Sequence, residues 1–486
     1  MESWIVAGQK GKENSMREVQ NIIIGFGKAG KTLAGYLAKK GEKTVLIEEN
    51  PLRYGGTCIN VACIPSKSLE NSARESALLG GEFSEKAERY QKAIEEKRRL
   101  THFLRGKNLE KVQGAGVEVI DGRASFLDEH RILVESAKGD EEIRGERIFI
   151  NTGAKTIIPK ITGVESSKRV YTSESMMELD TLPKNLVIIG GGYIGLEFAS
   201  YYQNFGSTVT ILQDSNDFIP REDREMAKAI EENMEKMGIT LCKGVTVQEI
   251  KDQEKESLIL FQQEGEGKTI TADAILVATG RKPNAENLAL EKAGLSLTER
   301  GAIPVDSSLR TKVPQIPVDS SLRTKVPHIF AMGDVTGGMQ FTYISLDDFR
   351  IVKAALEQEA KGEGTALRST ENRGAIPYSV FLTPAFSRVG ITEEEAKAQG
   401  KQYRVAKLPV AAIPKAQVLR QTAGLLKVII EEGSNLILGA HLYCPESYEM
   451  INLIKLAMDQ KIPANVLASQ IYTHPTMTEA FNDLLG

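Results

Sequence analysis

Alternating runs of apolar and polar residues predict two βαβ units at separate places in the chain. The first has an apolar strand at Val19–Ile24, a GFGKAG turn, a helical pattern over Thr32–Lys40 and a second strand at Thr44–Glu48. The same order returns within 186–213, where NLVII precedes GGGYIG, a helix runs through Phe205, and STVTILQ follows. Two such units in one chain predict an α/β protein with two dinucleotide sites.

The rest of the chain predicts further helices and a separate C-terminal domain. A charged stretch over Glu82–Leu109 is typical of a long helix, and its EEKRR run at 95–99 predicts a solvent-exposed helix face. Ser345–Glu359 predicts another helix, and Lys361–Arg373 a linker. The last stretch, 376–486, mixes strands such as LILGAHLY with helices, which predicts an α+β domain.

Two segments stand outside this pattern. Residues 1–15 have no periodicity and end just before Met16, so we interpret them as a disordered extension. Residues 303–315, IPVDSSLRTKVPQ, are followed by an almost identical copy at 316–328. Two copies are too few for a solenoid, so we interpret them as a recent duplication or an assembly artefact. One copy should form the strand before IFAMGD while the other loops outward.

Length and charge narrow the class of protein. At roughly 100–200 residues per domain, 486 residues provide about three domains. Lys and Arg total 61 against 65 for Asp and Glu, a net charge of −4, so nothing indicates a nucleic-acid or membrane partner. Four cysteines do not make a secreted disulfide scaffold, and no apolar run approaches the roughly 18 residues of a membrane helix. The opening residues lack a signal-peptide pattern, so we expect a cytoplasmic protein.

The glycine-rich turns carry the first chemistry. G-x-G-x-x-G after a strand lets the backbone approach a pyrophosphate at a helix N-terminus, and an acid at the end of the next strand can bind ribose. In the first turn these residues are Gly25, Gly27, Gly30 and Glu48. In the second turn they are Gly190, Gly192, Gly195 and, at the acid position, Gln213. Gln lacks the charge that rejects a 2′-phosphate, and no Arg is present to bind one, so NADH is favoured and NADPH stays open.

Two cysteines stand five residues apart in GGTCINVACIPSK. Cys58 and Cys63 lack the second ligand pair of a zinc site. A regular helix would hold them too far apart for a disulfide, so they can bridge only if Cys58 lies in an irregular turn before the helix. Pro65 fits a first helical turn, which would place Cys63 at the positive end of the helix dipole. An inert buried pair is the alternative, and Cys242 and Cys444 are interpreted as structural.

One histidine near the C-terminus is a candidate proton carrier. YTHPTMTEA places His474 before a helix that we expect to begin at the proline and to carry Glu479 in its second turn. A carboxylate that orients the imidazole would suit proton transfer to thiols. A structural histidine is the alternative reading of the same pattern.

Together these residues resemble the class I pyridine nucleotide-disulfide oxidoreductases, the flavoprotein family of lipoamide dehydrogenase, glutathione reductase and mercuric reductase. The likeness covers Met16 to Leu485 and is closest to a branch linked to reactive-chlorine resistance, through GFGKAGKTLA, YGGTCIN, GDVTGGMQFTYISLDD, PVAAIP and EMIN. It implies two Rossmann-like domains and a C-terminal α+β dimerisation domain. The implied boundaries are 16–155 with 275–360 for FAD, 156–274 for NAD(P), and 370–486 for dimerisation.

The resemblance also implies roles for single residues. The FAD-binding residues would be Gly25, Gly27, Gly30, Glu48, Gly56, Thr57, Thr152, Gly153, Gly280, Gly333 and Asp334. The pyridine nucleotide would be held by Gly190, Gly192, Gly195 and Gln213, with Tyr193 as an aromatic gate. Lys67 and Glu197 resemble an ion pair near the flavin. Cys63 resembles the charge-transfer thiol and Cys58 the interchange thiol of a redox-active disulfide. His474 and Glu479 resemble an acid/base dyad lent by the second subunit of a homodimer.

The implied activity is a relay from NAD(P)H through FAD and the Cys58–Cys63 disulfide to a small-molecule or metal-ion acceptor, in oxidative, reactive-chlorine or copper stress. No metal is expected as a resident cofactor. Dihydrolipoyl dehydrogenase or another small-disulfide reductase is one alternative, although Tyr472 replaces a histidine common in lipoamide dehydrogenases. A flavin-bound redox sensor is a second alternative, from a different functional class.

Overall fold

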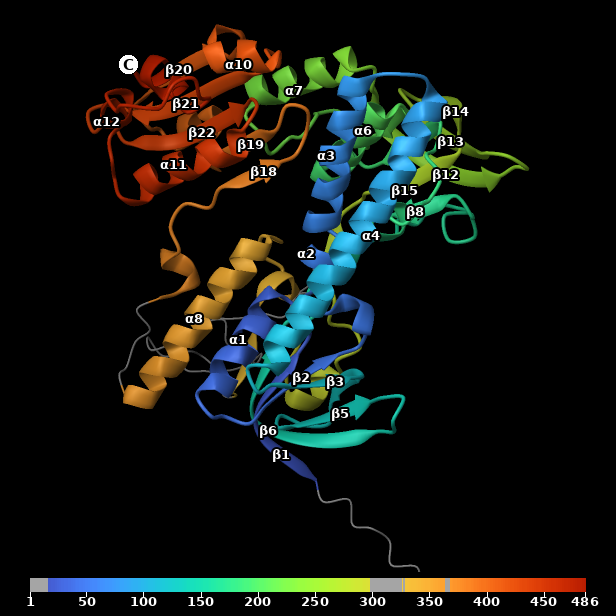
Figure 1. The fold of residues 1–486 in the computed structure, drawn as a ribbon, viewed down its shortest axis with the longest axis vertical. Coiled ribbons are helices and arrows are strands. Elements are labelled where there is room, and N and C mark those ends of the chain that lie inside the picture. Colours follow the sequence, from blue (N-terminus) through green and yellow to red (C-terminus); the bar gives the residue numbers. More distant parts are fainter. Residues whose placement is uncertain (1–15, 298–325, 327, 363–367) are drawn as a thin grey trace, which may run out of the picture. The chain divides into compact units, whose positions relative to one another are not determined.

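The computed structural model describes residues 16–297, 326, 328–362 and 368–486 (Figure 1). Its contacts divide the chain into two compact units, each built from three segments. Unit 1 comprises Met1–Gly56, Arg105–Ala154 and Lys282–Thr370. Unit 2 comprises Thr57–Leu104, Lys155–Arg281 and Glu371–Gly486. Unit 2 thus holds the second predicted βαβ unit together with the C-terminal sheet, and the division into three domains stays a prediction.

Unit 1 is built on a seven-stranded sheet in the order β3-β2-β1-β6-β5-β4, with β17 paired to β6. The strands are β1 (Arg17–Ile24), β2 (Thr44–Glu48), β3 (Glu118–Asp121), β4 (Arg123–Phe126), β5 (Arg131–Glu135), β6 (Glu141–Ile150) and β17 (Ile329–Ala331). β1, β2, β3, β6 and β17 are parallel, while β4 and β5 pair antiparallel. Every residue of β2 is buried, as expected for a strand covered on both faces.

Helices α1 (Lys28–Lys39) and α8 (Thr342–Lys361) pack on one face of this sheet. Their inward residues, among them Leu33, Leu37 and Ile351, form one apolar cluster with Ile23 and Phe149 of the strands. The unit also contains the short 3-10 turns η1 (Pro51–Arg53), η2 (Leu290–Ala293) and η3 (Gly333–Thr336). The first predicted βαβ unit is therefore confirmed, with a helix that begins four residues earlier than its pattern indicated.

Unit 2 contains a five-stranded parallel sheet in the order β11-β10-β9-β15-β8 and an antiparallel meander. The strands are β8 (Val170–Thr172), β9 (Asn185–Ile189), β10 (Thr208–Leu212), β11 (Thr240–Cys242), β15 (Ala274–Val277) and, in the meander, β12 (Val245–Asp252), β13 (Ser257–Gln263) and β14 (Glu266–Ala272). Its helices are α2 (Thr57–Asn60), α3 (Cys63–Leu79), α5 (Ser173–Met176), α6 (Tyr193–Phe205) and α7 (Arg224–Lys236). The second βαβ unit, β9-α6-β10, is confirmed. A further two-stranded sheet pairs β7 (Ala154–Thr156) with β16 (Arg281–Pro283).

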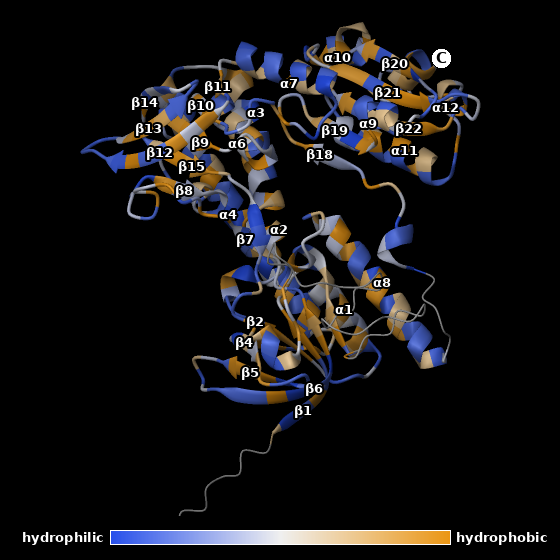
Figure 2. Cartoon of the chain, turned by 180° about the vertical axis from the view of Figure 1, so that it is seen from behind, coloured by the Kyte–Doolittle hydropathy of each residue, from blue (hydrophilic) through white to orange (hydrophobic). Residues whose placement is uncertain are grey.

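The C-terminal part of unit 2 is an antiparallel sheet in the order β18-β19-β22-β21-β20. Its elements are β18 (Tyr378–Val380), β19 (Phe386–Gly390), α9 (Glu393–Ala398), β20 (Tyr403–Pro409), α10 (Pro414–Leu419), β21 (Leu425–Glu431), β22 (Ile437–Tyr443), α11 (Ser447–Asp459), α12 (Ala464–Ala468) and α13 (Ala480–Leu485). Leu426, Val428 and Leu442 of the strands pack with Ile454 of α11 and Phe481 of α13. Figure 2 shows hydrophobic colour along β21 and β22.

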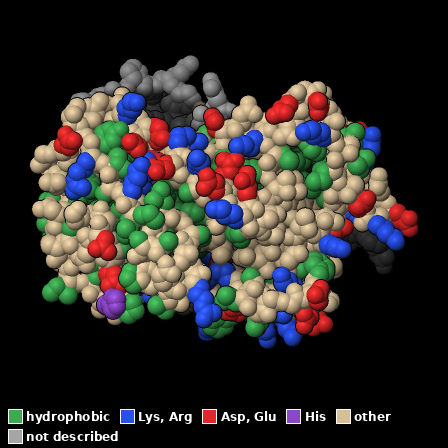
Figure 3. Space-filling view, turned by 90° about the horizontal axis from the view of Figure 1, so that it is seen from above, with side chains coloured by type: hydrophobic (Ala, Val, Ile, Leu, Met, Phe, Trp, Pro, Cys, Tyr) green, Lys and Arg blue, Asp and Glu red, His purple; other side chains and the backbone are tan. Residues whose placement is uncertain are grey.

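The charged helix differs in part from its prediction. α4 spans Phe83–Gln113, so the expected helix is confirmed, but Lys97 within the EEKRR run is fully buried. Its ammonium pairs with Glu178, which also binds Arg98 at 2.9 Å. The prediction of a solvated face is therefore wrong at Lys97, because a carboxylate about eighty positions away in sequence supplies its counter-charge. On the face viewed in Figure 3, acidic and basic side chains are interspersed.

Two further expectations concern segments that the structure leaves largely undescribed. The extension at 1–15 lies outside the described residues. So do both copies of the duplicated segment, apart from Val326 and His328. Among the residues that the structure does describe, no helix is both long and apolar enough to cross a membrane.

Candidate active site

The first glycine turn lies at the carboxyl edge of the sheet in unit 1, between β1 and α1. A methyl group at Gly25 would come within 2.4 Å of the Asn151 carbonyl oxygen, and one at Gly30 within 2.7 Å of the Gly25 oxygen. Gly25 also has φ +99°, which favours glycine. These contacts explain why the backbone can turn so tightly into α1.

The N–H groups of this turn show where an anion would fit. Asn151 accepts from Gly30 N at 2.9 Å through its side-chain oxygen, and Ser345 accepts from Ala29 N at 3.1 Å. Within the described part of the chain, no protein group accepts from Gly27 N or Lys28 N at the start of α1. These two donors at the positive end of a helix fit a pyrophosphate.

Glu48 lies at the end of β2 beside this turn. Its carboxylate accepts from Phe26 N at 3.0 Å and from Asn50 N at 3.2 Å. Burial raises the pKa of Glu48, and the two backbone donors oppose that rise. Both oxygens keep a second lone pair, so the side chain can also accept from ribose hydroxyls.

The other residues expected at the FAD site come from neighbouring strand ends. A methyl group at Gly56 would come within 2.8 Å of the Gly27 Cα, so the Gly-Gly turn packs directly on the first glycine turn. Thr152 donates to the Asn284 carbonyl at 2.6 Å, and Asn284 N donates to Gly153 O at 2.9 Å.

A second group of expected residues follows β17. Gly333 donates its N–H to Asp348 at 2.7 Å and opens η3, which carries Asp334. The unit 1 sheet thus brings the ends of β1, β2, β6 and β17 to one edge, where open α/β sheets bind ligands. Thr57 and Gly280 belong to unit 2. Asn151 had no motif of its own, and Ser345 and Asp348 lie in a stretch that carried the resemblance without a role for either residue; the contacts of Asn151 and Ser345 link parts of the chain that are distant in sequence.

The second glycine turn opens α6. A methyl group at Gly190 would come within 2.5 Å of the Ala278 oxygen, and one at Gly195 within 2.2 Å of the Gly190 oxygen. A methyl group at Gly192 would meet no atom within 4 Å. In the described chain no protein group accepts from the N–H groups of Gly192, Tyr193 and Ile194. This open helix N-terminus fits a pyrophosphate.

Gln213 lies at the end of β10, beside this second turn. Its amide nitrogen donates to the Ser215 and Asp217 carbonyl oxygens, at 2.8 Å each. Its amide oxygen faces Gly191, where an added methyl group would lie only 2.1 Å away. With both amide hydrogens engaged, Gln213 presents only an acceptor to a ligand.

The two motif cysteines lie in consecutive helical segments. Cys58 is in the four-residue helix α2, and Cys63 is the first residue of α3 after a break at 61–62. We predicted that the two cysteines can bridge only if Cys58 lies in an irregular turn before the helix. Cys58 instead lies in a separate short helix, and the backbone break between α2 and α3 interrupts the regular helix between the two cysteines. Cys63 at a helix start is as predicted, and both side chains are partly exposed.

Lys67 and Glu197 form the expected ion pair. The Lys67 ammonium lies 2.6 Å from the Glu197 carboxylate and 4.6 Å from the ring centroid of Phe381. The other oxygen of Glu197 accepts from Phe381 N at 2.9 Å. Because Lys67 follows Cys63 by one helical turn, the ammonium is fixed on the same helix as the cysteine.

His474 and Glu479 form the expected dyad. His474 Nδ1 lies 2.8 Å from the Glu479 carboxylate, and this hydrogen bond lowers the pKa of Glu479. The expected helix beginning at the proline is wrong, since α13 begins only at Ala480. Thr476 and Glu479 instead exchange hydrogen bonds between side chain and backbone, at 3.1 and 3.2 Å, which form a cap before the helix.

Comparisons with known proteins agree with this geometry. The profile of the pyridine nucleotide-disulphide oxidoreductases matches residues 19–316, and that of the family's dimerisation domain matches 376–485. The chain is 45% identical to the probable pyridine nucleotide-disulfide oxidoreductase RclA of Escherichia coli K12, with 97% of this chain and 99% of RclA covered. It is 32% identical to a dihydrolipoyl dehydrogenase of Geobacillus stearothermophilus, over 95% of this chain and 94% of that one.

Solved structures give the same result. The HOCl-induced flavoprotein disulfide reductase RclA from Escherichia coli superposes with a TM-score of 0.86 at 44% identity, covering 96% of this chain and 99% of RclA. Its Cu(II) complex superposes with a TM-score of 0.87, covering 97% and 99%.

The predicted fold class is confirmed, as are FAD and a pyridine nucleotide as the cofactors of an oxidoreductase. The C-terminal sheet and its helices form the dimerisation domain. The chain belongs to the pyridine nucleotide-disulphide oxidoreductase family.

Proposed function

We propose that this enzyme carries electrons from NADH through FAD to a Cys58–Cys63 disulfide, and from the resulting thiols to an acceptor. The observation that carries the proposal is the place of Cys63 as the first residue of α3, with Cys58 in the short helix just before it. The positive end of a helix stabilises a thiolate at this place. Cys58, on the separate segment, is the thiol that meets the acceptor.

FAD, when bound, supplies the two-electron exchange between nicotinamide and disulfide. The residues that would hold it are those at the carboxyl edge of the unit 1 sheet. Gly27 N and Lys28 N would bind its pyrophosphate, Glu48 its ribose, and Asp334 its ribityl chain. Lys67 and Glu197, as a fixed ion pair, would orient charge near the reacting ring.

The second turn would bind NADH in preference to NADPH. The N–H groups at the start of α6 fit its pyrophosphate, and a methyl group at Gly192 would find open space where that group must lie. Gln213 offers only an acceptor oxygen, which suits the hydroxyls of a ribose and gives a 2′-phosphate no hydrogen-bond donor. Exposed Asp214 adds a negative charge beside it.

In a homodimer, the proton carrier for the cysteines of one subunit would be a histidine of the other subunit. Nδ1 of His474 donates to the Glu479 carboxylate, so Nε2 is the ring nitrogen that can give or take a proton. The His474 side chain is 69% exposed in the single chain, which suits a group that acts on another subunit. In the proposed dimer, the partner subunit's His474 protonates and deprotonates Cys58.

For the acceptor we propose a small molecule or metal ion met in reactive-chlorine or copper stress. This proposal is supported by 45% identity to RclA over nearly the full length of both chains. RclA is described as an HOCl-induced flavoprotein, and its structure was solved as a Cu(II) complex. We also infer a cytoplasmic location, where NADH is available. Dihydrolipoyl dehydrogenase is the second candidate, because a curated dehydrogenase shares 32% identity over almost the whole chain.

Steady-state NADH oxidation tests the proposal with copper(II), mercury(II), a quinone, lipoamide and glutathione disulfide as separate acceptors. Copper(II) should support many turnovers in the wild type, and both Cys58→Ser and Cys63→Ser should lose them while keeping bound flavin. Cys242→Ser, on β11, is the matched control and should behave as the wild type. Full activity in both active-site variants would contradict the relay. Rapid turnover with lipoamide alone would favour the dehydrogenase, and a single stoichiometric reduction would indicate a redox sensor.

A further inference from the structure

A buried carboxylate, Glu222, joins the second dinucleotide turn to the C-terminal sheet within unit 2. It lies just before α7, and its side chain has no exposed surface. Tyr193, the first residue of α6, donates its hydroxyl to Glu222 Oε1. Tyr378, the first residue of β18, donates to the same oxygen at 2.6 Å. The two hydroxyl oxygens lie 3.2 Å apart, so one carboxylate oxygen serves two tyrosines.

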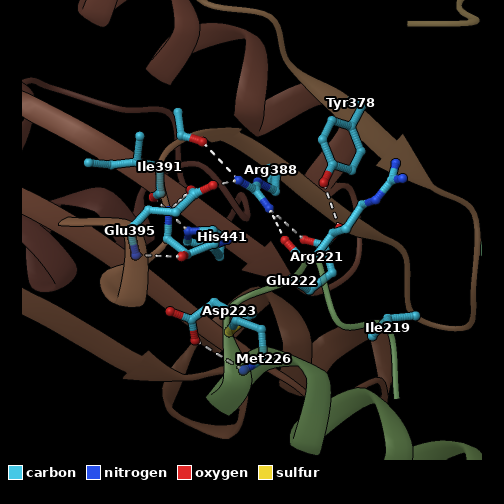
Figure 4. A network of polar contacts seen from close by, with 12 residues as sticks. Ile219, Arg221, Glu222, Asp223, Met226, Tyr378, Arg388, Ile391, Glu395 and His441 are labelled. Atoms are coloured by element: carbon cyan, nitrogen blue, oxygen red, sulfur yellow. Dashed lines mark hydrogen bonds and ion pairs between the residues drawn. The ribbon is translucent and has the colours of Figure 1, made fainter. Parts of the chain in front are cut away.

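Arg388 of β19 gives this carboxylate its counter-charge. The guanidinium lies 3.3 Å from Glu222 Oε2, donates to the Arg221 carbonyl at 2.7 Å, and lies 5.7 Å from the ring centroid of Tyr378 (Figure 4). Arg388 therefore pairs with one oxygen of the carboxylate, while the other oxygen accepts from the two tyrosines. Burial, with the charge of Glu222, raises the pKa of Tyr193, so its hydroxyl keeps its proton and acts as the donor.

We propose that Glu222 is a positioning residue that fixes the ring of Tyr193, and that Tyr378 weakens this hold by sharing the acceptor oxygen; together they set how readily the nicotinamide end of NADH enters its site. The inference rests on the proposed function and on the role of aromatic gate that the family resemblance implies for Tyr193. Displacing the ring breaks a hydrogen bond to a buried carboxylate, and NADH binding must supply that free energy. The dimerisation domain thus takes part in nucleotide entry.

The shared oxygen makes the two tyrosines act in opposite directions. Tyr193→Phe keeps the ring but loses the bond, so the apparent Kd for NADH should fall about tenfold. Tyr378→Phe leaves the oxygen to Tyr193 alone and strengthens its hold, so the Kd should rise by about threefold. Loss of structure would weaken binding in both variants, so a fall in one and a rise in the other identifies positioning.

The test is anaerobic stopped-flow reduction of the flavin by NADH, which gives the apparent Kd and the limiting rate. Glu222→Gln should lower the Kd as Tyr193→Phe does, and the two changes together should do no more than either alone. Binding of ADP-ribose, which lacks the nicotinamide, should be the same in every variant. Tyr403→Phe on β20 is the matched control and should leave both ligands unaffected.

Equal NADH Kd values in wild type and both phenylalanine variants, or shifts in one direction only, would overturn the inference. So would a change in ADP-ribose affinity that follows the change for NADH. In those cases NADH still reduces the flavin, and the proposed function stands. A wild-type flavin that NADH does not reduce would overturn both the proposed function and the inference.

Discussion

Replacing Gly192 by alanine separates the binding role of the second glycine turn from its folding role. Gly192 is the N-cap of α6 with φ −80° and ψ 176°, a conformation open to any residue, and the added methyl group meets no atom within 4 Å. Alanine at the N-cap lowers the free energy of unfolding by up to about 1 kcal/mol. Alanine also restricts the unfolded chain more than glycine does, which raises the free energy of unfolding by about 0.4–1 kcal/mol. The free energy of unfolding should therefore hardly change.

NADH binding should respond quite differently. The methyl group would stand over the open N–H groups that we assign to the pyrophosphate. Losing one charge-assisted hydrogen bond costs about 1.5–3 kcal/mol, so the KM for NADH should rise roughly 10- to 100-fold. The bound FAD, which we place in unit 1, should be unaffected.

The assay combines urea unfolding with steady-state kinetics on Gly192→Ala and on Gly195→Ala as the matched control. Gly195→Ala places a methyl group 2.2 Å from the Gly190 oxygen, so it should lose stability as well as NADH binding. A Gly192→Ala enzyme with normal stability and a normal KM for NADH would show that the nucleotide does not bind at this turn.

Three further changes have expected outcomes from other contacts. Lys427→Met removes the cation that lies 2.9 Å from fully buried Asp223, so the free energy of unfolding should fall by about 3–5 kcal/mol in urea titrations; an unchanged value would refute the buried pair. His474→Gln should lower turnover of a disulfide acceptor by about 10²- to 10⁴-fold while flavin reduction by NADH continues. Because His474 lowers the pKa of Glu479, their pair stabilises the fold above the usual glutamate pKa and loses this effect as the pH falls through the lowered value. The variant should lack that acid dependence of its Tm. Gln213→Glu sets a carboxylate against two carbonyl oxygens, so the KM should rise for both NADH and NADPH, and a sharper NADH preference at unchanged KM would contradict this geometry.

Local sequence predicted much of the fold and site, because glycine turns, strand ends and the cysteine segment are encoded within short stretches. The turn around Gly25 and the start of α3 at Cys63 lie where their patterns placed them. The His474–Glu479 contact was also correct, although the helix after it begins later. There Thr476 and Glu479 bond each other's backbone N–H groups, so a cap precedes the α-helix. The pattern of apolar and polar residues does not reveal such a cap.

The features that sequence missed depend on partners far away in the chain. Lys97 reads as a surface charge until Glu178 is brought beside it. In the same way, nothing near Tyr193 indicates that Tyr378, at a separation of 185 positions, shares its acceptor. Only the folded chain brings such groups together, since they have no common periodicity.

Anaerobic reductive titration tests the central claim most directly. The wild type should take up twice as many electrons as Cys58→Ser, because flavin and disulfide each accept a pair, and peptide mapping of the oxidised wild type should show Cys58 joined to Cys63. Equal uptake by the wild type and Cys58→Ser, with both thiols free after oxidation, would contradict the account.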